Sequence, residues 1–422
     1  MTGQQDETAR AAGAVGVLGL LTLLNTLNFV DRQLLASFAN FIVPELKLSN
    51  AQFAILTGPA FILFYALAGL AMGVVADMVH RGRLIAGAVG LWSVFTAASG
   101  MAVSFLSLLW PRALIGVGEA ALTPAALSML ADRFPERRLG LVSGVYYAGV
   151  PIGAGLSLLL AGFAGPAIGW RACFFALGAA GLLLAITTFC IRDVRVSSRT
   201  TVRPQVRGVV DTFWRGLTGS PALMLVIAAG ILLHGLIGSS VFDQLWLVRE
   251  RGFERGSIAV TTGAIMVAAG LAGNLYGGVV SDHWRRRTGQ SRLTLLVLTM
   301  LVLAPFVVAL RVVAPDSPFF WLGVFASAFQ LGAMYAPIFS TIQELSAPQV
   351  RSTTLAFSIF AMNVFGIGLG AYLCGVSIDV LTRARAPQPY TTVSLTMTTL
   401  SLLAIPLLWL ASRRDAVAAA PA

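Results

Sequence analysis

Long apolar stretches alternate with short polar junctions along almost the whole chain. Each stretch has roughly 20 residues or more, the length that a helix needs to cross a bilayer. Cutting the sequence at its charged and Pro- or Gly-rich junctions predicts twelve spans, at residues 13–38, 50–76, 83–104, 106–131, 138–163, 168–191, 221–247, 256–281, 292–313, 318–346, 350–377 and 390–411. The pattern therefore predicts an all-α polytopic membrane protein.

Composition agrees with this prediction, because 57% of the 422 residues are hydrophobic and only 11% are charged. The net charge of +11 raises the question of a nucleic-acid partner. With an inside N-terminus and alternating spans, nineteen basic residues fall inside and eight outside, while Arg32 and Arg112 lie within spans. This asymmetry is the positive-inside rule, so we expect cytoplasmic termini and no nucleic-acid partner.

The spans form two groups of six around a basic linker at 192–220 that contains six arginines. GVVADMVHRGR (73–83) corresponds to GVVSDHWRRR (278–287), and FVDRQL (29–34) corresponds to VFDQLW (241–246). The prolines of TPAALSMLADRFPERR and APIFSTIQELSAPQVR are also paired, at an offset of 213 residues. Several matches in the same order indicate a duplicated six-helix unit. The predicted parts are a tail (1–12), a first bundle (13–191), the linker (192–220), a second bundle (221–412) and a tail (413–422).

Three motifs resemble those of the major facilitator superfamily. GVVADMVHRGR is similar to its loop motif between helices two and three, RALIG (112–116) to its fourth-helix arginine motif, and GVPIGAG (149–155) to its glycine-rich fifth helix. Met78 and Gly82 depart from the loop motif, so part of the usual cytoplasmic gate network is expected to be missing. LNFVDRQLL, LSNAQFAILTGPAFILFYALAG and IGVGEAALTPAALSMLADRFPERR further resemble the spinster-like branch.

The resemblance implies a fold of two pseudo-symmetric six-helix bundles and transport by alternating access through a central cavity. It implies a bacterial inner-membrane protein and an anionic amphiphile, such as a lysophospholipid or a sphingoid phosphate, as substrate. Many related transporters with an aspartate-arginine pair on helix one move small hydrophilic organic anions instead. The same arginines serve both substrate classes, so the alternative stays open.

Four charged residues fall within predicted spans, where charge is costly and usually functional. Asp31 and Arg32 are adjacent in span one and point about 100° apart, so each is expected to find partners on another helix. Arg112 and Glu119 are seven residues apart in span four and share one face. Because these residues lie at similar depths in the two spans, the two carboxylates and two guanidiniums are expected to meet in one cavity.

The chemistry of these groups predicts a division of labour. Arg32 and Arg112 match an anionic head group, since arginine stays charged and donates in a fork. Asp31 and Glu119 are the candidates for proton coupling: if substrate occupies Arg112, then Glu119 loses its counter-ion and takes a proton. The family's fourth-helix arginine is likewise associated with proton coupling. The alternative is a structural ion pair that joins helices one and four.

Further candidates lie elsewhere in the chain. Asp77 and Asp282 sit beside arginines at cytoplasmic helix ends and predict a gate made of Gly73, Asp77, Arg81, Asp282 and Arg285, with solvated loop charge as the alternative. Polar groups inside spans are candidate substrate contacts or packing residues: Tyr146, His234, Asn363, Asn274, Gln330 and Tyr335.

Other classes of function are disfavoured. An ATP site needs a lysine after its glycines, and the only lysine is Lys47 in the first external loop. Neither GxSxG nor HExxH occurs, so no enzyme is expected. The three isolated cysteines and three scattered histidines predict no metal site. A channel does not suit a rocking two-bundle architecture, while a non-transporting receptor remains an alternative. We expect a monomer whose coupling ion is the proton, without a cofactor.

Overall fold

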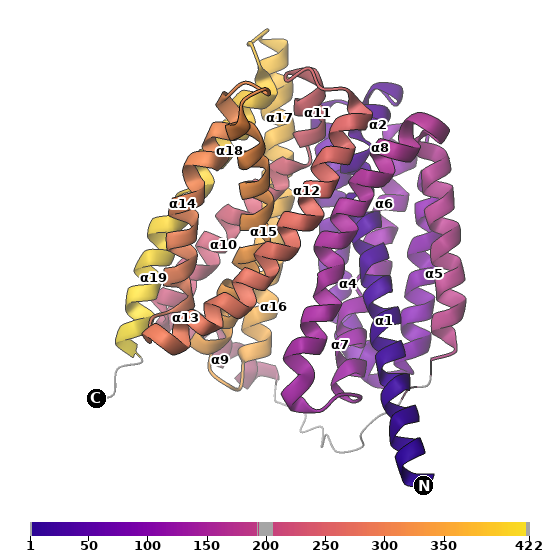
Figure 1. Ribbon diagram of the computed structural model, residues 1–422, viewed down its shortest axis with the longest axis vertical. Coiled ribbons are helices and arrows are strands. Elements are labelled where there is room, and N and C mark those ends of the chain that lie inside the picture. Colours follow the sequence, from indigo (N-terminus) through magenta and orange to yellow (C-terminus); the bar gives the residue numbers. More distant parts are fainter. Residues whose placement is uncertain (1, 192, 194–205, 419–422) are drawn as a thin grey trace. The chain divides into compact units, whose positions relative to one another are not determined.

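The computed structural model of the chain describes residues 2–191, 193 and 206–418 (Figure 1). Every regular element in these residues is a helix, which confirms the predicted all-α fold. Contacts between the helices divide the chain into two compact units. Unit 1 contains Met1–Leu48 and Ala60–Thr200, and unit 2 contains Ser49–Pro59 and Thr201–Ala422.

Unit 1 is built from seven helices. They are α1 (Thr2–Ser37), α2 (Ala39–Glu45), α4 (Pro59–Met78), α5 (Arg81–Ser99), α6 (Phe105–Glu119), α7 (Leu122–Ala131) and α8 (Glu136–Phe189). Within this unit α8 packs against α1 and α5, and α5 also packs against α6. The two helices that carry the intramembrane charges, α1 and α6, therefore belong to one packed body.

Unit 2 contains the remaining helices, together with two short π-helical segments, η1 and η2. They are α3 (Asn50–Thr57), α9 (Val206–Gly219), α10 (Pro221–Ser240), α11 (Asp243–Arg249), α12 (Arg255–Leu275), η1 (Tyr276–Val280), α13 (Ser281–Thr288), α14 (Arg292–Val312), α15 (Pro318–Leu345), α16 (Arg351–Ala361), η2 (Met362–Gly368), α17 (Leu369–Arg383), α18 (Pro389–Ser401) and α19 (Ala404–Ala418). Its apolar core includes side chains of α10, α14, α15 and α19.

Eleven helical stretches in the described residues are long and apolar enough to cross a membrane. One of them, Arg138–Phe189, has 52 residues and covers two predicted spans, 138–163 and 168–191. The chain turns inside it at Gly169, whose φ of 78° favours glycine because a Cβ is strained there. The eleven stretches thus cover all twelve predicted spans, as expected for a multi-pass membrane protein.

Two predicted spans are broken by a proline. Between α3 and α4, Gly58 leaves the helical region with φ −115° and ψ −99°, because Pro59 disfavours helical geometry in the residue before it. Between α6 and α7, Pro124 supplies no N–H to the carbonyl of Ala120, four residues earlier. The first break separates α3 from α4, and the second follows directly after Glu119.

The first candidate membrane span is Gly13–Ser37, which starts at the predicted residue. The helix that contains it begins earlier, at Thr2, since residues 2–12 contain good helix formers and no proline. Of the predicted linker, residues 192 and 194–205 lie outside the described residues, and its last part forms α9. Phe213 and Leu217 of α9 are buried in unit 2, so α9 packs against the unit that it precedes in the chain.

Glycines bring α1, α4, α6 and α8 of unit 1 unusually close together. A Cβ on Gly153 of α8 would lie 2.4 Å from the carbonyl oxygen of Thr26 in α1. A Cβ on Gly116 of α6 would lie 2.6 Å from the carbonyl oxygen of Phe61 in α4. Both distances are far below van der Waals contact, so these glycines are required for the packing that surrounds the charged residues.

Candidate functional site

The four intramembrane charges predicted from the sequence lie together in unit 1. Asp31, Arg112 and Glu119 are each only 2% exposed. Arg32 differs, because 25% of its side chain is exposed while the Glu119 side chain is 0% exposed. Of the two cations, Arg32 is therefore the more exposed.

Glu119 pairs with Arg32, whereas the predicted mechanism gave it Arg112 as counter-ion. Oε2 of Glu119 accepts from Nη2 of Arg32 at 3.1 Å and from its Nε at 3.3 Å. The other carboxylate oxygen, Oε1, is buried and has no hydrogen-bond partner among the described residues, and the same is true of Oδ1 of Asp31. A buried, unpartnered carboxylate oxygen is costly while it carries charge. The two carboxyl groups thus offer two places for a proton.

Arg112 binds the backbone of α1. Its Nη1 donates to the carbonyl oxygen of Asp31 at 3.2 Å, and its Nη2 donates to that of Arg32 at 2.6 Å. Because guanidinium is a planar fork of donors, one side chain can hold two adjacent carbonyls. Arg112 therefore fixes α6 to α1 at the level of the charged pair and positions that pair.

Three aromatic rings surround the guanidinium of Arg32, and none of them was predicted from the sequence. Its Cζ lies 4.9 Å from the ring centre of Phe29, 4.8 Å from that of Phe61 and 4.6 Å from that of Tyr65. Phe61 also faces Arg112, at 4.9 Å. Cation-ring contacts stabilise by about 0.5–2 kcal/mol each, depending on exposure. A sequence signal existed, since Phe61 and Tyr65 are four residues apart and share a helix face.

Tyr146 of α8 is also in unit 1 and is fully buried. Its hydroxyl lies 3.2 Å from Oγ1 of Thr123, and its carbonyl oxygen accepts from Nδ2 of Asn25 at 2.8 Å. These contacts join α8 to α7 and to α1. In this conformation Tyr146 braces the helices around the charged cluster, and its role as a substrate contact stays a prediction.

The candidates of the second bundle lie in unit 2. His234 is buried in α10, where Nδ1 donates to the carbonyl oxygen of Gly230 at 2.8 Å and the ring meets Tyr335 edge-on at 5.7 Å. A Cβ on Gly366 would lie 2.5 Å from Cβ of His234, so η2 packs directly on this part of α10. Asn363 belongs to η2 and is partly exposed. A role for His234 and Asn363 in substrate binding stays a prediction.

Asn274 and Gln330 are the other two polar candidates of unit 2. Asn274 lies in α12 and is partly exposed, whereas Gln330 of α15 is buried. Oε1 of Gln330 has no hydrogen-bond partner in the described part of the chain. These two positions also remain predicted contacts.

The predicted gate residue Arg81 is the centre of an ion cluster in unit 1. It is 3% exposed and donates to Asp132 at 2.7 Å, to Ser128 at 2.9 Å and, through Nη2, to Asp193 at 2.6 Å. Gly73 and Asp77 lie in α4, and the description does not extend to their side chains. The sequence did not point to Asp193, because it follows the end of α8 without any motif of its own.

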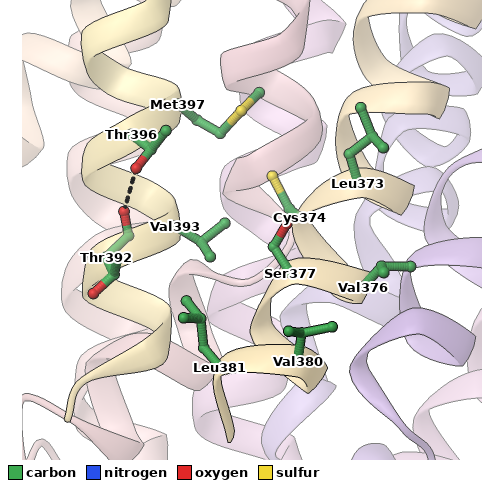
Figure 2. A pocket seen from close by; sticks show the side chains of 10 residues that line it. All are labelled: Leu373, Cys374, Val376, Ser377, Val380, Leu381, Thr392, Val393, Thr396 and Met397. Atoms are coloured by element: carbon green, nitrogen blue, oxygen red, sulfur yellow. Dashed lines mark hydrogen bonds between the residues drawn. The ribbon is translucent and has the colours of Figure 1, made fainter. Parts of the chain in front are cut away.

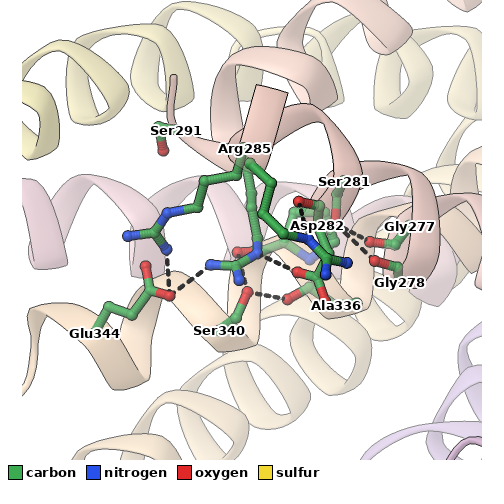
Figure 3. A network of polar contacts seen from close by, with 12 residues as sticks. Gly277, Gly278, Ser281, Asp282, Arg285, Ser291, Ala336, Ser340 and Glu344 are labelled. Carbon is green, nitrogen blue, oxygen red and sulfur yellow. Dashed lines mark hydrogen bonds and ion pairs between the residues drawn. The ribbon is translucent and has the colours of Figure 1, made fainter. Parts of the chain in front are cut away.

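The corresponding cluster of unit 2 joins α13, α14 and α15. Glu344 accepts from both Arg285 and Arg292, and Asp282 accepts from Nε of Arg292 at 2.7 Å. Figure 3 shows Glu344 close to an arginine side chain in the same network as Arg285, with Ser340 one turn away on the same helix. Predicted residues Asp282 and Arg285 thus meet in one network, which Arg292 and Glu344 complete.

The two clusters are related by the sequence repeat. Ser128 and Asp132 of unit 1 and Ser340 and Glu344 of unit 2 lie in the two segments that the repeat pairs through their prolines, one residue away from exact correspondence at the 213-residue offset. In each unit an acid at the end of a long membrane helix binds an arginine from the loop motif.

Unit 2 also contains a groove of about 400 Å³ between α17 and α18 (Figure 2). Its walls are mostly apolar, and its polar groups are the hydroxyls of Ser377, Thr392 and Thr396 together with the thiol of Cys374. No lining side chain is charged, so the groove offers an anion no ion pair. In the described residues no group of three or more His, Cys, Asp or Glu side chains is placed to hold a metal ion.

Comparison with known proteins shows which proteins the chain is similar to. Residues 21–371 match the family described as Major Facilitator Superfamily. A Mycolicibacterium smegmatis protein named MFS-type efflux pump is 32% identical over 393 residues, which cover 92% of this chain and 90% of that protein. The hexuronate transporter of Bacillus subtilis is 28% identical, with 83% and 85% covered. Protein spinster of Drosophila melanogaster is 24% identical, with 86% and 61% covered.

The fold is shared with solved structures as well. A bacterial homolog of the human lysosomal transporter Spinster, in an inward-facing and unoccupied conformation, superposes with a TM-score of 0.80. It is 24% identical and the match covers 95% of this chain and 97% of that one. These matches confirm the predicted fold and the predicted spinster-like relationship.

Proposed function

Because the chain belongs to the major facilitator superfamily and has spinster-like relatives, we propose that this transporter is proton-coupled and moves an anionic amphiphile by alternating access. The substrate class is that of a lysophospholipid or a sphingoid phosphate. Membership in a family of transporters also means that the chain is not an enzyme.

The observation that carries the proposal is the Arg32–Glu119 pair. Arg32 is partly open and is held among three aromatic rings, whereas Glu119 is closed off and has one unpartnered oxygen. An oxygen of a phosphate or carboxylate can accept from Nε and Nη2 of Arg32 as Oε2 of Glu119 does. The substrate head group and Glu119 thus compete for one guanidinium.

That competition supplies the coupling step. When an anion takes Arg32, both oxygens of Glu119 are left buried without a donor, and a proton from solution removes that cost. The site then holds one anion and one proton, and the neutralised cluster can pass through a closed state. Asp31, also buried with an unpartnered oxygen, is the second proton site.

The rings of Phe29, Phe61 and Tyr65 support the choice of an amphiphile, because apolar surface beside the cation can receive the first carbons of a tail. The alternative is a small hydrophilic organic anion, which the hexuronate transporter among the relatives favours. Both substrates require Arg32. They differ in whether apolar surface contributes to binding.

The proposed orientation places both termini in the cytoplasm of a bacterial cell, within its inner membrane. Nineteen basic residues on the inner side against eight on the outer side support this orientation. We propose a monomer as the working unit. No cofactor takes part, since the proton is the coupling ion.

The test uses proteoliposomes that enclose a pH-sensitive dye. A single-chain lysophospholipid and glucuronate, a hexuronate, are added separately to wild type and to Arg32→Gln. Arg383→Gln, at the exposed end of α17, is the matched loss of one arginine outside the site. Empty liposomes correct for spontaneous flip-flop of the lipid.

A saturable proton signal with the lysophospholipid, weakened on the order of tenfold or more in Arg32→Gln, supports the proposal, because hydrogen bonds to a charged group are lost. The same pattern with glucuronate alone selects the alternative substrate class. A signal that is unchanged in Arg32→Gln contradicts the role of the pair for both substrates.

A further inference from the structure

One helix of the first sequence repeat is packed within the second structural unit. Residues 50–57 form α3, the start of predicted span two, yet their contacts place them in unit 2. A Cβ on Gly375 of α17 would lie 2.5 Å from the carbonyl oxygen of Asn50. A Cβ on Gly58 would lie 3.2 Å from Cβ of Ala371, also in α17. The helix is therefore seated on α17 at backbone distance.

Asp379 of α17 caps the N-terminus of this helix. Its Oδ1 accepts from the backbone N–H of Asn50 at 3.0 Å, and its Oδ2 accepts from the N–H of Ala51 at 2.9 Å. Ser49 and Gln52 satisfy the next N–H group by a capping box. The first N–H groups of a helix lack partners inside the helix. Here two of them are satisfied by a side chain that lies 329 residues from Asn50 in the sequence.

A second contact fixes the same helix end. The side chain of Asn50 donates to Oδ1 of Asp379 at 2.8 Å and accepts from the hydroxyl of Tyr390 at 2.6 Å. Tyr390 in turn accepts from Nη1 of Arg249. Asn50 is 8% exposed and Tyr390 is 4% exposed, so water competes little for these bonds. Lower on the helix, Phe53 meets Phe242 edge-on at 5.7 Å.

The corresponding helix of the second repeat is capped by a residue of its own segment, unlike α3. Span eight, the counterpart of span two, begins with α12, which is capped by its own preceding residue. Glu254 accepts from the N–H groups of Gly256 at 2.8 Å and Ser257 at 2.6 Å. A local acid is thus sufficient to cap such a helix, whereas α3 takes its carboxylate from a helix of the other repeat.

We infer that Asn50, Asp379 and Tyr390 form a latch, here called the α3 latch, that holds α3 on unit 2 in one state of the transport cycle and releases it in the other. The inference rests on the proposed function, since alternating access requires the two repeats to separate at the outer end, where the positive-inside rule places residue 50. The break at Gly58 and Pro59 lets α3 follow unit 2 while α4 stays in unit 1. Asp379 acts as a positioning residue, because it touches the helix end and not the substrate.

The test measures how often α3 separates from α17. It needs no substrate, no proton gradient and no defined orientation of the protein in the membrane. Cys173, Cys190 and Cys374 are first replaced by alanine, and Ala54→Cys then places a single thiol on the buried face of α3, where Ala54 is 0% exposed. The purified variants are reconstituted in lipid nanodiscs and treated with a water-soluble maleimide. The rate of labelling reports how often α3 is released.

Asp379→Asn should raise the labelling rate of Ala54→Cys about tenfold, because asparagine keeps the shape of the side chain but offers one acceptor oxygen and loses the charge. Tyr390→Phe should raise it by a smaller factor, since a single hydroxyl is removed. Glu254→Gln removes the matched cap on α12 and should leave the rate unchanged. Ala229→Cys, 0% exposed in the core of unit 2, should stay protected in all of these variants.

Equal labelling of Ala54→Cys with and without Asp379→Asn overturns the latch. If Ala229→Cys is exposed as well in Asp379→Asn, that variant has unfolded unit 2, and Tyr390→Phe then decides alone. A rate in Tyr390→Phe equal to that of the parent again overturns the latch. Absence of proton flux in the liposome assay refutes the proposed coupling instead, and leaves this labelling result standing.

Discussion

Gly116→Ala should disturb the charged site through the packing of two helices. A Cβ at this position would lie 2.6 Å from the carbonyl oxygen of Phe61 and 3.1 Å from the N–H nitrogen of Tyr65. Ordinary contact begins at 3.4 Å, so α4 and α6 must separate by about 3.4 − 2.6 = 0.8 Å. Phe61 and Tyr65 are two of the rings that surround Arg32, so the same shift changes the contacts between these rings and its guanidinium.

The size of the effect can be isolated with a matched glycine. Gly144→Ala in α8 gains the same helix propensity but meets nothing within 4 Å. The difference between the two variants therefore measures the clash alone, which overpacking data place at about 1–3 kcal/mol. For a folding unit of this size, 2 kcal/mol corresponds to roughly 4–8 °C in the unfolding midpoint.

The assay is thermal unfolding of the two purified variants in the same detergent, followed by proton flux with the active substrate. We expect Gly116→Ala to unfold several degrees below Gly144→Ala and to transport more weakly. Midpoints that agree within about 1 °C would refute the packing argument, because the clash is the only difference between the two substitutions.

Two further predictions concern single side chains. Arg112→Lys should lower the unfolding midpoint and transport together, since lysine lacks the planar fork that reaches both carbonyls of α1 and a loss of about 1–3 kcal/mol follows; Arg383→Gln is the control in the same assays. The N–H groups of Gly256 and Ser257 hold the pKa of Glu254 below its ordinary value of 4.5. Its ionised form therefore adds stability above that value, which is lost as the pH falls through the folded pKa. The midpoint difference between wild type and Glu254→Gln should accordingly be full at neutral pH and shrink on acidification below 4.5; a constant difference would contradict the cap.

Periodicity and charge were enough to predict the spans, the duplication and the placing of Asp31, Arg32, Arg112 and Glu119 on two neighbouring helices. They were not enough to predict which arginine pairs with Glu119. The backbone carbonyls of α1 compete for Arg112, and a pattern of side chains contains no information about that competition. The pairing depends on helix distance and rotation, which the glycines at 116 and 153 determine.

Other structural features are indicated by local sequence patterns that the division into apolar spans does not use. Pro59 and Pro124 each indicate a broken span, and apolar residues at 206, 209, 210, 213 and 217 have the spacing of an amphipathic helix inside the basic linker. The seat of α3 on α17 had no such signal, because Asp379 and Asn50 are distant in sequence and each is unremarkable in its own segment. Contacts of this kind depend on the folded arrangement.

The central claim is that Glu119 takes a proton when the substrate anion takes Arg32. The most direct measurement is proton flux into dye-loaded proteoliposomes together with uptake of labelled substrate, for wild type, Glu119→Gln and the exposed control Asp316→Asn. We predict that wild type and Asp316→Asn move protons with substrate, whereas Glu119→Gln still binds and exchanges labelled substrate but moves no protons at that site. Unchanged proton flux per substrate in Glu119→Gln would contradict the account.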